Sequence, residues 1–362
     1  MRPGIPVEVL KARLEKLRRR MEERGLDTVM IRTLSSFRYF TGVKWLRPAL
    51  LIPLDGEPIA FVARGEEEGF KRMTWIRDVR TFVEGGELMS KVSSTVRSEL
   101  KARRVGLDYS VERDSYSLFY EMFKRLNPGV EVVDVHEDLA ELRMIKDEWE
   151  RELIRRAGEL ARKALERALS TVEPGVAETE VAAEAYYSLY KSGCEDPLVY
   201  VNAGPGPRVH AELLSSVRVR TGTTVTIVVG ADYGGYYANA ARTVVVGDCE
   251  KGSEALRAME RVYELAVELT RPGARFIDVI RALDRIYEEE GLLSHRLLGY
   301  AHGVGLQVEE EPITTIIPRH RFIRVRRGMT LAMVHAPLLI HGVGQVKLED
   351  TFLVGDELEK LT

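Results

Sequence analysis

The second half of the chain runs twice through one order of predicted elements. Helical patterns over 148–171 and from Thr179 onward precede predicted strands at 198–201, 217–219, 223–229 and 242–246. Two more helical patterns, over 253–269 and 276–289, precede the last predicted strands. The helices are recognised by apolar residues that recur every three to four positions. Although no strict sequence repeat occurs, this order predicts an α+β domain with pseudo-two-fold symmetry, in which helix pairs cover a sheet.

The first part of the chain has a different pattern. An amphipathic helix is predicted over 7–25, with Leu10, Leu14, Leu17 and Met21 on one face and Gly25 as its stop. Short strands at 28–31, 49–53, 58–62, 79–83 and 105–107 alternate with helical patterns. We therefore expect an α/β domain over residues 1–139, followed by the second domain over 140–362.

Composition limits the classes of partner. A net charge of −3 over 362 residues gives no general attraction to nucleic acid or to an anionic membrane, and no apolar run is long enough to cross a bilayer. The two cysteines, Cys194 and Cys249, form no C-x-x-C pair, which favours a reducing compartment and a cytoplasmic location. Asn and Gln are scarce while Arg, Lys and Glu are abundant, a bias typical of hyperthermophilic sources.

Several motifs of the second domain carry residues suited to chemistry. His210 ends A-G-P-G-P-R-V-H, His302 lies in A-H-G-V-G-L, and Glu349 lies in V-K-L-E-D-T. A histidine with a near-neutral pKa can transfer protons, and a carboxylate can orient it or activate water. We predict that these three residues are catalytic if the chain is an enzyme.

These motifs, together with L-R-M-I-K-D before them and R-L-E-K-L-R-R-R-M-E-E-R-G-L-D near the N-terminus, resemble the creatinase and Xaa-Pro dipeptidase/aminopeptidase family. The resemblance implies a pita-bread fold for the second domain and metal-assisted amide hydrolysis at two divalent ions. It also implies a homodimer and a short peptide or small amide as ligand, with neither nucleic acid nor membrane as partner.

The resemblance implies five metal-ligand positions, which carry two aspartates, a histidine and two glutamates in the family. In this chain they are Val228, Asn239, His302, Val334 and Glu349. Because valine has no donor atom, the pattern predicts that apolar side chains close the metal pocket, so we assign no metal ligand and expect no cofactor. Strand alternation predicts that His335, next to Val334, points to the opposite face.

Three residues are predicted to contact a ligand. Glu310 matches a glutamate of the family's H-E-x-P motif, Asn239 replaces a carboxylate, and Tyr236 lies near Asn239 in the same segment. Glu309 takes the position of a substrate-contacting histidine, although a solvated acidic loop would give the same E-E-E run.

Three functions are compatible with the sequence, and whether the chain is an enzyme is open. One is a member of the family that has lost its metals and binds peptides or small amides. The second is a metal-independent hydrolase of C–N bonds that uses His210. The third is a divergent Xaa-Pro peptidase, with one ion held by His302, Glu349 and a borrowed carboxylate.

Overall fold

The computed structural model describes residues 5–45, 49–110, 117–209 and 212–362. The chain divides into two compact units, Met1–Arg143 and Met144–Thr362. Within the described residues, none of the helices combines the length and the apolar composition needed to cross a membrane.

The N-terminal unit is built on a six-stranded sheet in the order β4-β3-β2-β1-β5-β6. Its strands are β1 (Thr28–Ile31), β2 (Ala49–Pro53), β3 (Ile59–Ala63), β4 (Asp78–Phe82), β5 (Arg104–Leu107) and β6 (Glu131–Asp134). Its helices are α1 (Val7–Arg24), α2 (Leu34–Thr41), α3 (Glu67–Lys71), α4 (Gly85–Ser94), which continues as a π-helical turn at Thr95–Glu99, α5 (Ser117–Leu126) and α6 (His136–Met144).

The C-terminal unit is built on a sheet in the order β11-β10-β12-β15-β9-β8-β7, with β16 paired to β15. Its strands are β7 (Leu198–Ala203), β8 (Thr223–Tyr233), β9 (Tyr236–Val246), β10 (Ala301–Gly303), β11 (Glu310–Ile313), β12 (Thr330–Met333), β15 (Glu349–Val354) and β16 (Leu358–Lys360). A separate hairpin joins β13 (Leu338–Ile340) to β14 (Gly344–Val346). The strand expected at 217–219 is reduced to one bridge between Arg218 and Ala177.

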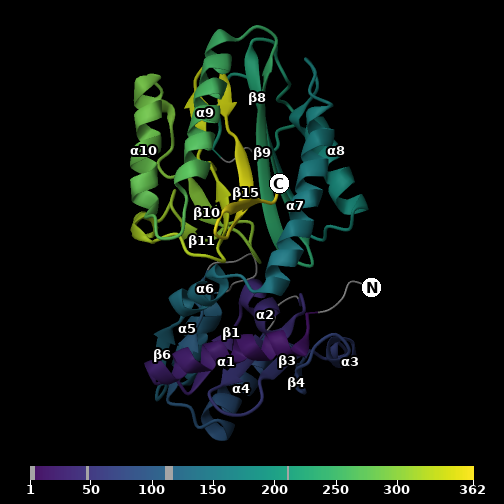
Figure 1. Ribbon diagram of the computed structural model, residues 1–362. Helices are drawn as coiled ribbons and strands as arrows, with labels where there is room; N and C mark the ends of the chain where they lie inside the picture. The colour runs from purple at the N-terminus through teal and green to yellow at the C-terminus, as the bar shows by residue number, and fades with distance from the viewer. Residues whose placement is uncertain (1–4, 46–48, 111–116, 210–211) are drawn as a thin grey trace. The chain divides into compact units, whose positions relative to one another are not determined.

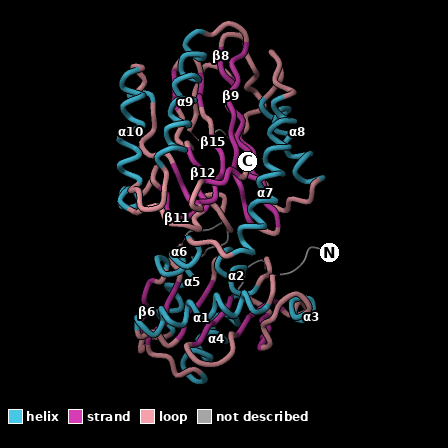
Figure 2. Tube along the Cα trace, in the orientation of Figure 1, coloured by secondary structure: helices cyan, strands magenta, loops and turns pink. Residues whose placement is uncertain are grey.

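Two helix pairs accompany this sheet, as Figures 1 and 2 show. The first pair is α7 (Glu148–Leu169) and α8 (Glu178–Lys191), and the second is α9 (Glu250–Leu269) and α10 (Phe276–Glu289). Helix α7 begins at a capping box formed by Asp147 and Glu150, which satisfies free N–H groups of its first turn. Short 3₁₀ turns occur at Leu293–His295 and Pro318–Phe322.

The sheet has the predicted pseudo-two-fold order. Strands β7, β8 and β9 follow α7 and α8, and strands β10, β12 and β15 follow α9 and α10. The two halves meet where β9 pairs antiparallel with β15, in a register that places Ala241 opposite Glu349. The α+β class expected from the repeated element order is confirmed.

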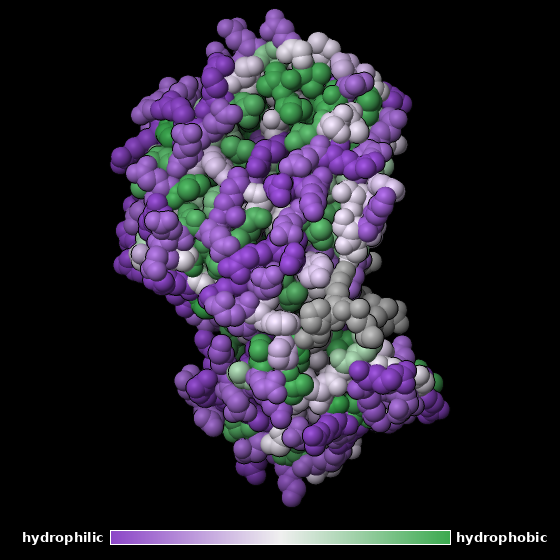
Figure 3. Space-filling view, turned by 45° about the vertical axis from the view of Figure 1, so that its right-hand side comes forward, coloured by the Kyte–Doolittle hydropathy of each residue, from purple (hydrophilic) through white to green (hydrophobic). Residues whose placement is uncertain are grey.

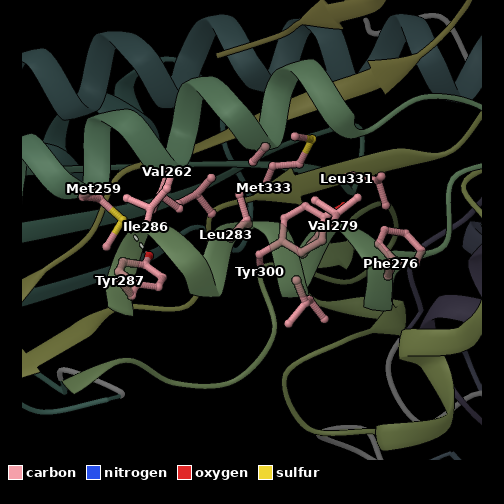
Figure 4. Close-up of a cluster of buried hydrophobic side chains, with 14 of the residues drawn as sticks. Met259, Val262, Phe276, Val279, Leu283, Ile286, Tyr287, Tyr300, Leu331 and Met333 are labelled. Atoms are coloured by element: carbon pink, nitrogen blue, oxygen red, sulfur yellow. Dashed lines mark hydrogen bonds between the residues drawn. The ribbon is translucent and has the colours of Figure 1, made fainter. Parts of the chain in front are cut away.

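One face of the sheet is buried under the helices. In the second half, Met259 and Val262 of α9 and Leu283 of α10 pack with Leu331 and Met333 of β12 (Figure 4). The first half buries alternate residues of β7, β8 and β9 against α7 and α8 in the same way. Because strand side chains alternate between faces, the residues between these core positions lie on the opposite face. Elsewhere on the surface, polar side chains are interspersed among apolar ones (Figure 3).

Candidate functional site

A cavity of ≈ 310 Å³ lies on the sheet face opposite the helices of the C-terminal unit. Its walls are largely apolar and include Leu198, Val228, Leu297, Leu298, Val308, Ile316 and Pro337. Ile316 is 65% exposed, so the cavity reaches solvent on that side. Binding sites for small molecules commonly combine such apolar walls with a few converging polar groups.

The strand register brings cavity residues from both halves together. Glu349 of β15 pairs with Ala241 of β9, which pairs with Val228 of β8, which pairs with Tyr200 of β7. Gly230 and Asn239 form the next cross-strand pair on the same face. A Cβ atom at Gly230 would meet Val308 Cγ2 at 2.8 Å, so glycine keeps this part of the cavity open.

His302 lies at the buried end of the cavity. Its side chain is 1% exposed, and its Nδ1 lies 2.8 Å from the carbonyl oxygen of Gly303, to which it donates. This bond leaves the Nε2 lone pair directed elsewhere, and Nε2 lies 3.8 Å from Glu349 Oε1. Burial, reinforced by the neighbouring His335, lowers the pKa of His302 to about 4, so its imidazole is neutral at neutral pH.

His335 lines the cavity, so the prediction that strand alternation turns it to the face away from the site is wrong. Strand β12 ends at Met333, and Val334 has a φ of 59°, in the left-handed region. This conformation interrupts the strand alternation between Met333 and Val334, so both side chains point to the same face. The Val334 side chain is 2% exposed and packs, like Met333, into the core under α9 and α10. His335 then lies edge-on to His302, with ring centroids 4.3 Å apart. Val334 therefore does not close the cavity.

A buried ion pair lies beside the two imidazoles. Lys347 Nζ is 2.6 Å from Glu349 Oε2 and 3.2 Å from His335 Nδ1. Although burial alone would raise it, the Lys347 ammonium and His335 hold the pKa of Glu349 below its ordinary value. The carboxylate is therefore ionised at neutral pH.

Two further polar residues, Asn239 and Glu309, line the cavity. Asn239 Nδ2 donates to the Val308 carbonyl at 2.8 Å, which fixes the orientation of the amide. Its Oδ1 and the Oε1 of Glu309 are buried and, within the described residues, have no hydrogen-bond partner. A ligand in the cavity could therefore place a donor or a cation against them.

The residues predicted from the sequence divide between the cavity and its surroundings. His302, Glu349 and Asn239 line it together. Glu310 does not: it is 6% exposed and forms an ion pair of 2.7 Å with Lys146. Tyr236 is fully buried and also lies outside the cavity lining. His210 lies outside the described residues.

The comparisons with known proteins agree with this architecture. Residues 13–145 match the model of the creatinase/prolidase N-terminal domain, and residues 152–356 match the model of metallopeptidase family M24. The chain belongs to family M24. An Xaa-Pro dipeptidase of Pyrococcus furiosus is 28% identical over 348 residues, which span 95% of each chain.

Solved structures of other M24 members share both domains. The prolidase from Pyrococcus horikoshii superposes with a TM-score of 0.87 at 26% identity, over 97% of this chain and 98% of that one. The prolidase from Pyrococcus furiosus gives a TM-score of 0.83 at 27% identity, over 95% and 98% of the two chains. The predicted resemblance to Xaa-Pro dipeptidases and the pita-bread fold are confirmed.

Two cavity residues, His335 and Lys347, were not assigned from the sequence, whereas Glu309 was placed at a substrate-contacting position by the family resemblance. The sequence holds no local signal for the left-handed Val334 that redirects His335. Lys347 lies two residues before Glu349 in V-K-L-E-D-T, a spacing that places two side chains on one face of an extended segment and could have indicated their contact. Within E-E-E, the carboxylate that enters the cavity is Glu309.

Proposed function

We propose that this M24 member binds a short peptide or a small amide in the cavity and does so without the family's pair of metal ions. The observation that carries the proposal is the ion pair between Lys347 and Glu349, located among the apolar walls of a peptidase-type cleft. An ammonium group already neutralises the carboxylate that would otherwise face a metal ion.

The residues present do not fit two divalent ions. Val228 lines the cavity but offers no donor atom, and the Val334 side chain lies in the core. Two dications would also lie close to the Lys347 ammonium, and repulsion between like charges is strong where water is excluded. No hydrolytic step through a two-metal centre is therefore derived for this chain.

The cavity instead suits an amide ligand. Asn239 Oδ1 and Gln345 Oε1 are buried acceptors that, in the described part of the chain, lack a donor. Gln345 Nε2 donates to the Arg208 carbonyl at 2.6 Å, so its oxygen rather than its nitrogen is available to a ligand. Two amide oxygens of this kind can accept the N–H groups of a peptide, while the apolar walls contact its side chains.

Isothermal titration with a panel of Xaa-Pro dipeptides, other dipeptides and small amides tests this function. We expect saturable one-site binding, reduced at least tenfold in Val228→Phe, which fills the cavity. Val245→Phe, an equal increase in size on β9 away from the cavity, should bind like the wild type. The absence of saturable binding across the panel, or equal affinity in Val228→Phe, would contradict the proposal.

Metal-independent hydrolysis is a second candidate, supported by the neutral imidazole of His302 beside the ionised Glu349. A neutral imidazole can accept a proton from a nucleophile, and an ionised carboxylate can stabilise the resulting imidazolium. It predicts turnover that persists in chelator and is lost in His210→Ala. Binding without turnover would exclude it. A homodimer, a cytoplasmic location and a hyperthermophilic source stay predictions.

A further inference from the structure

Two carboxylate oxygens in the cavity lack a neutralising contact. Glu309 Oε1 and Glu349 Oε1 are both buried, and no described residue donates a hydrogen bond to either. Glu349 satisfies its other oxygen through Lys347, at 2.6 Å, but Oε1 has only the His302 Nε2 atom at 3.8 Å. Buried charged acceptors of this kind call for a cation or a strong donor, because desolvation without compensation is costly.

One of the two histidines, His302, is oriented as metal-binding histidines usually are. It donates through Nδ1 to the backbone oxygen of Gly303, which fixes its tautomer and leaves the Nε2 lone pair for a ligand. His335 Nδ1 lies between Glu349 Oε2 at 3.4 Å and the Lys347 ammonium at 3.2 Å, so these two contacts hold the ring in place. Both rings contact each other at the end of the cavity that Glu309 also lines.

One donor atom from each of His302, His335 and Glu309 lies within 4.8 Å of the other two. We propose that these three residues bind a single divalent transition-metal ion, with Zn²⁺ as the reference ion and a fourth position open to the ligand. Zn²⁺ bonds of about 2.0–2.1 Å to nitrogen and oxygen would bring tetrahedral donors to about 3.4 Å apart. The required contraction falls on Glu309 and His335, which are only partly buried and lie outside regular strands.

The formal charge of the side chains around the site favours one bound ion over two. Lys347 contributes +1, while Glu309 and Glu349 contribute −1 each, so the cluster carries −1 before an ion binds. One dication brings the total to +1, which a bound hydroxide or a ligand carboxylate can cancel. A second dication would bring it to +3 in a mostly enclosed site, which is strongly unfavourable.

This ligand set differs from the five positions that the family resemblance implies. Of those five, only His302 takes part; Glu309 and His335 occupy other positions of the sequence. The inference rests on the proposed function only in placing the ion inside the same ligand cavity. The ion would present its open position to the carbonyl oxygen of a bound amide, as a Lewis acid.

The test uses the full chain, stripped of metal by chelator dialysis. Co²⁺ titration followed by visible absorption, Zn²⁺ competition, and elemental analysis after desalting measure affinity, coordination and stoichiometry. We expect one ion per chain and a loss of affinity of at least tenfold in Glu309→Gln and in His335→Ala. His341→Ala removes an exposed histidine of the β13–β14 hairpin and should bind like the wild type.

Each outcome decides the inference. No equimolar binding, two ions per chain, or unchanged affinity in Glu309→Gln would overturn it. Circular dichroism confirms folding, and Glu309→Gln alone decides if His335→Ala does not fold. Peptide titrations on the metal-free protein separate the two proposals. Peptide binding without metal binding would support the proposed function and overturn the metal site. Metal binding without peptide binding would support the metal site and overturn the proposed function.

Discussion

Lys347 and Glu349 form an ion pair of 2.6 Å at the same end of the cavity as His302 and His335. Both side chains are almost fully buried, with 7% and 1% of their surface exposed. A lysine ammonium thus supplies positive charge at the buried end of the cavity, beside the two imidazoles. Several consequences of this pair can be measured.

Removal of the ammonium should destabilise the C-terminal unit. Lys347→Met leaves the buried Glu349 carboxylate without its ammonium partner, and loss of one partner of a buried pair costs about 3–5 kcal/mol. Denaturant unfolding measures this loss of free energy. Because the cavity becomes more negative, Zn²⁺ should restore more stability to this variant than to the wild type.

Lys360→Met is the matched control for this variant. Lys360 pairs with the buried Asp350 at 2.7 Å, but it is 46% exposed, and Asp350 keeps its two bonds from Arg242. A loss of less than about 1 kcal/mol is expected, as for other exposed pairs. Equal losses in the two variants would show that Lys347 has no special role.

Restoration of carboxylates should succeed at one valine and fail at the other. Val228→Asp places a carboxylate in the cavity, where it can meet a cation, so we expect a folded protein with at least tenfold higher Zn²⁺ affinity. Val334→Glu places a carboxylate in the core under α9 and α10, at a cost of several kcal/mol. Thermal unfolding and metal titration measure both effects.

The expectation for Val334→Glu would change if Val334 faced the cavity. A stable Val334→Glu with raised metal affinity would contradict the left-handed geometry at Val334. In that case His335 would lose its place at the site as well.

The buried pair of Lys146 and Glu310 should be structural rather than functional. Glu310→Gln removes the carboxylate that pairs with the buried Lys146, so we expect a loss of about 3–5 kcal/mol in denaturant unfolding, while the folded variant keeps its metal and peptide affinity. The double variant Lys146→Met with Glu310→Leu should recover most of this loss, because an apolar pair avoids the desolvation of two charges. A selective loss of ligand affinity in Glu310→Gln would instead support a binding role.

Asp108 should make the stability of the N-terminal unit depend on pH in acid. Burial opposes its ionisation, but hydrogen bonds from His136, Ser110 and Thr33 outweigh burial and lower the pKa from 3.8 to about 2. A lowered pKa stabilises the fold above the ordinary value, and the benefit is lost as the pH falls from about 4 to about 2. The contribution is about 2 kcal/mol, from 1.36 kcal/mol per unit of pKa.

Asp108→Asn isolates this effect. The difference in unfolding free energy between wild type and variant should be constant above about pH 5 and should shrink below pH 4. Asp55→Asn, in the exposed turn between β2 and β3, serves as control. A difference that grows toward acid pH would contradict the assignment.

The element order could be predicted from the sequence because apolar periodicity is a local property. Helix α10 begins and ends where the pattern of Phe276 to Glu289 predicts, and β1 and β2 match their predicted ranges. The pairing of residues across strands could not be predicted in this way. The row from Glu349 through Ala241 to Val228 depends on the register between strands that are distant in the sequence.

The parts of the site that could not be predicted depend on non-local or unusual geometry. His335 enters the cavity because Val334 adopts a backbone conformation that β-branched residues rarely take. Glu310 is withdrawn from it by Lys146, 164 residues away in the sequence. The family resemblance placed Glu309 at a substrate-contacting position, and Glu309 does line the cavity, but the E-E-E run alone would also fit a solvated acidic loop.

The pairing of β9 with β15, where the two halves of the sheet meet, links ligand binding to the stability of the C-terminal unit. Asn239 belongs to the first half of the sheet and Glu349 to the second, so an occupant of the cavity contacts both halves at once. Any such occupant is a cross-link that only the folded unit can make, and at a hundredfold excess over its Kd it adds about 2.7 kcal/mol to stability. A rise in melting temperature therefore offers a way to identify the natural occupant among unlabelled compounds, before any reaction is known.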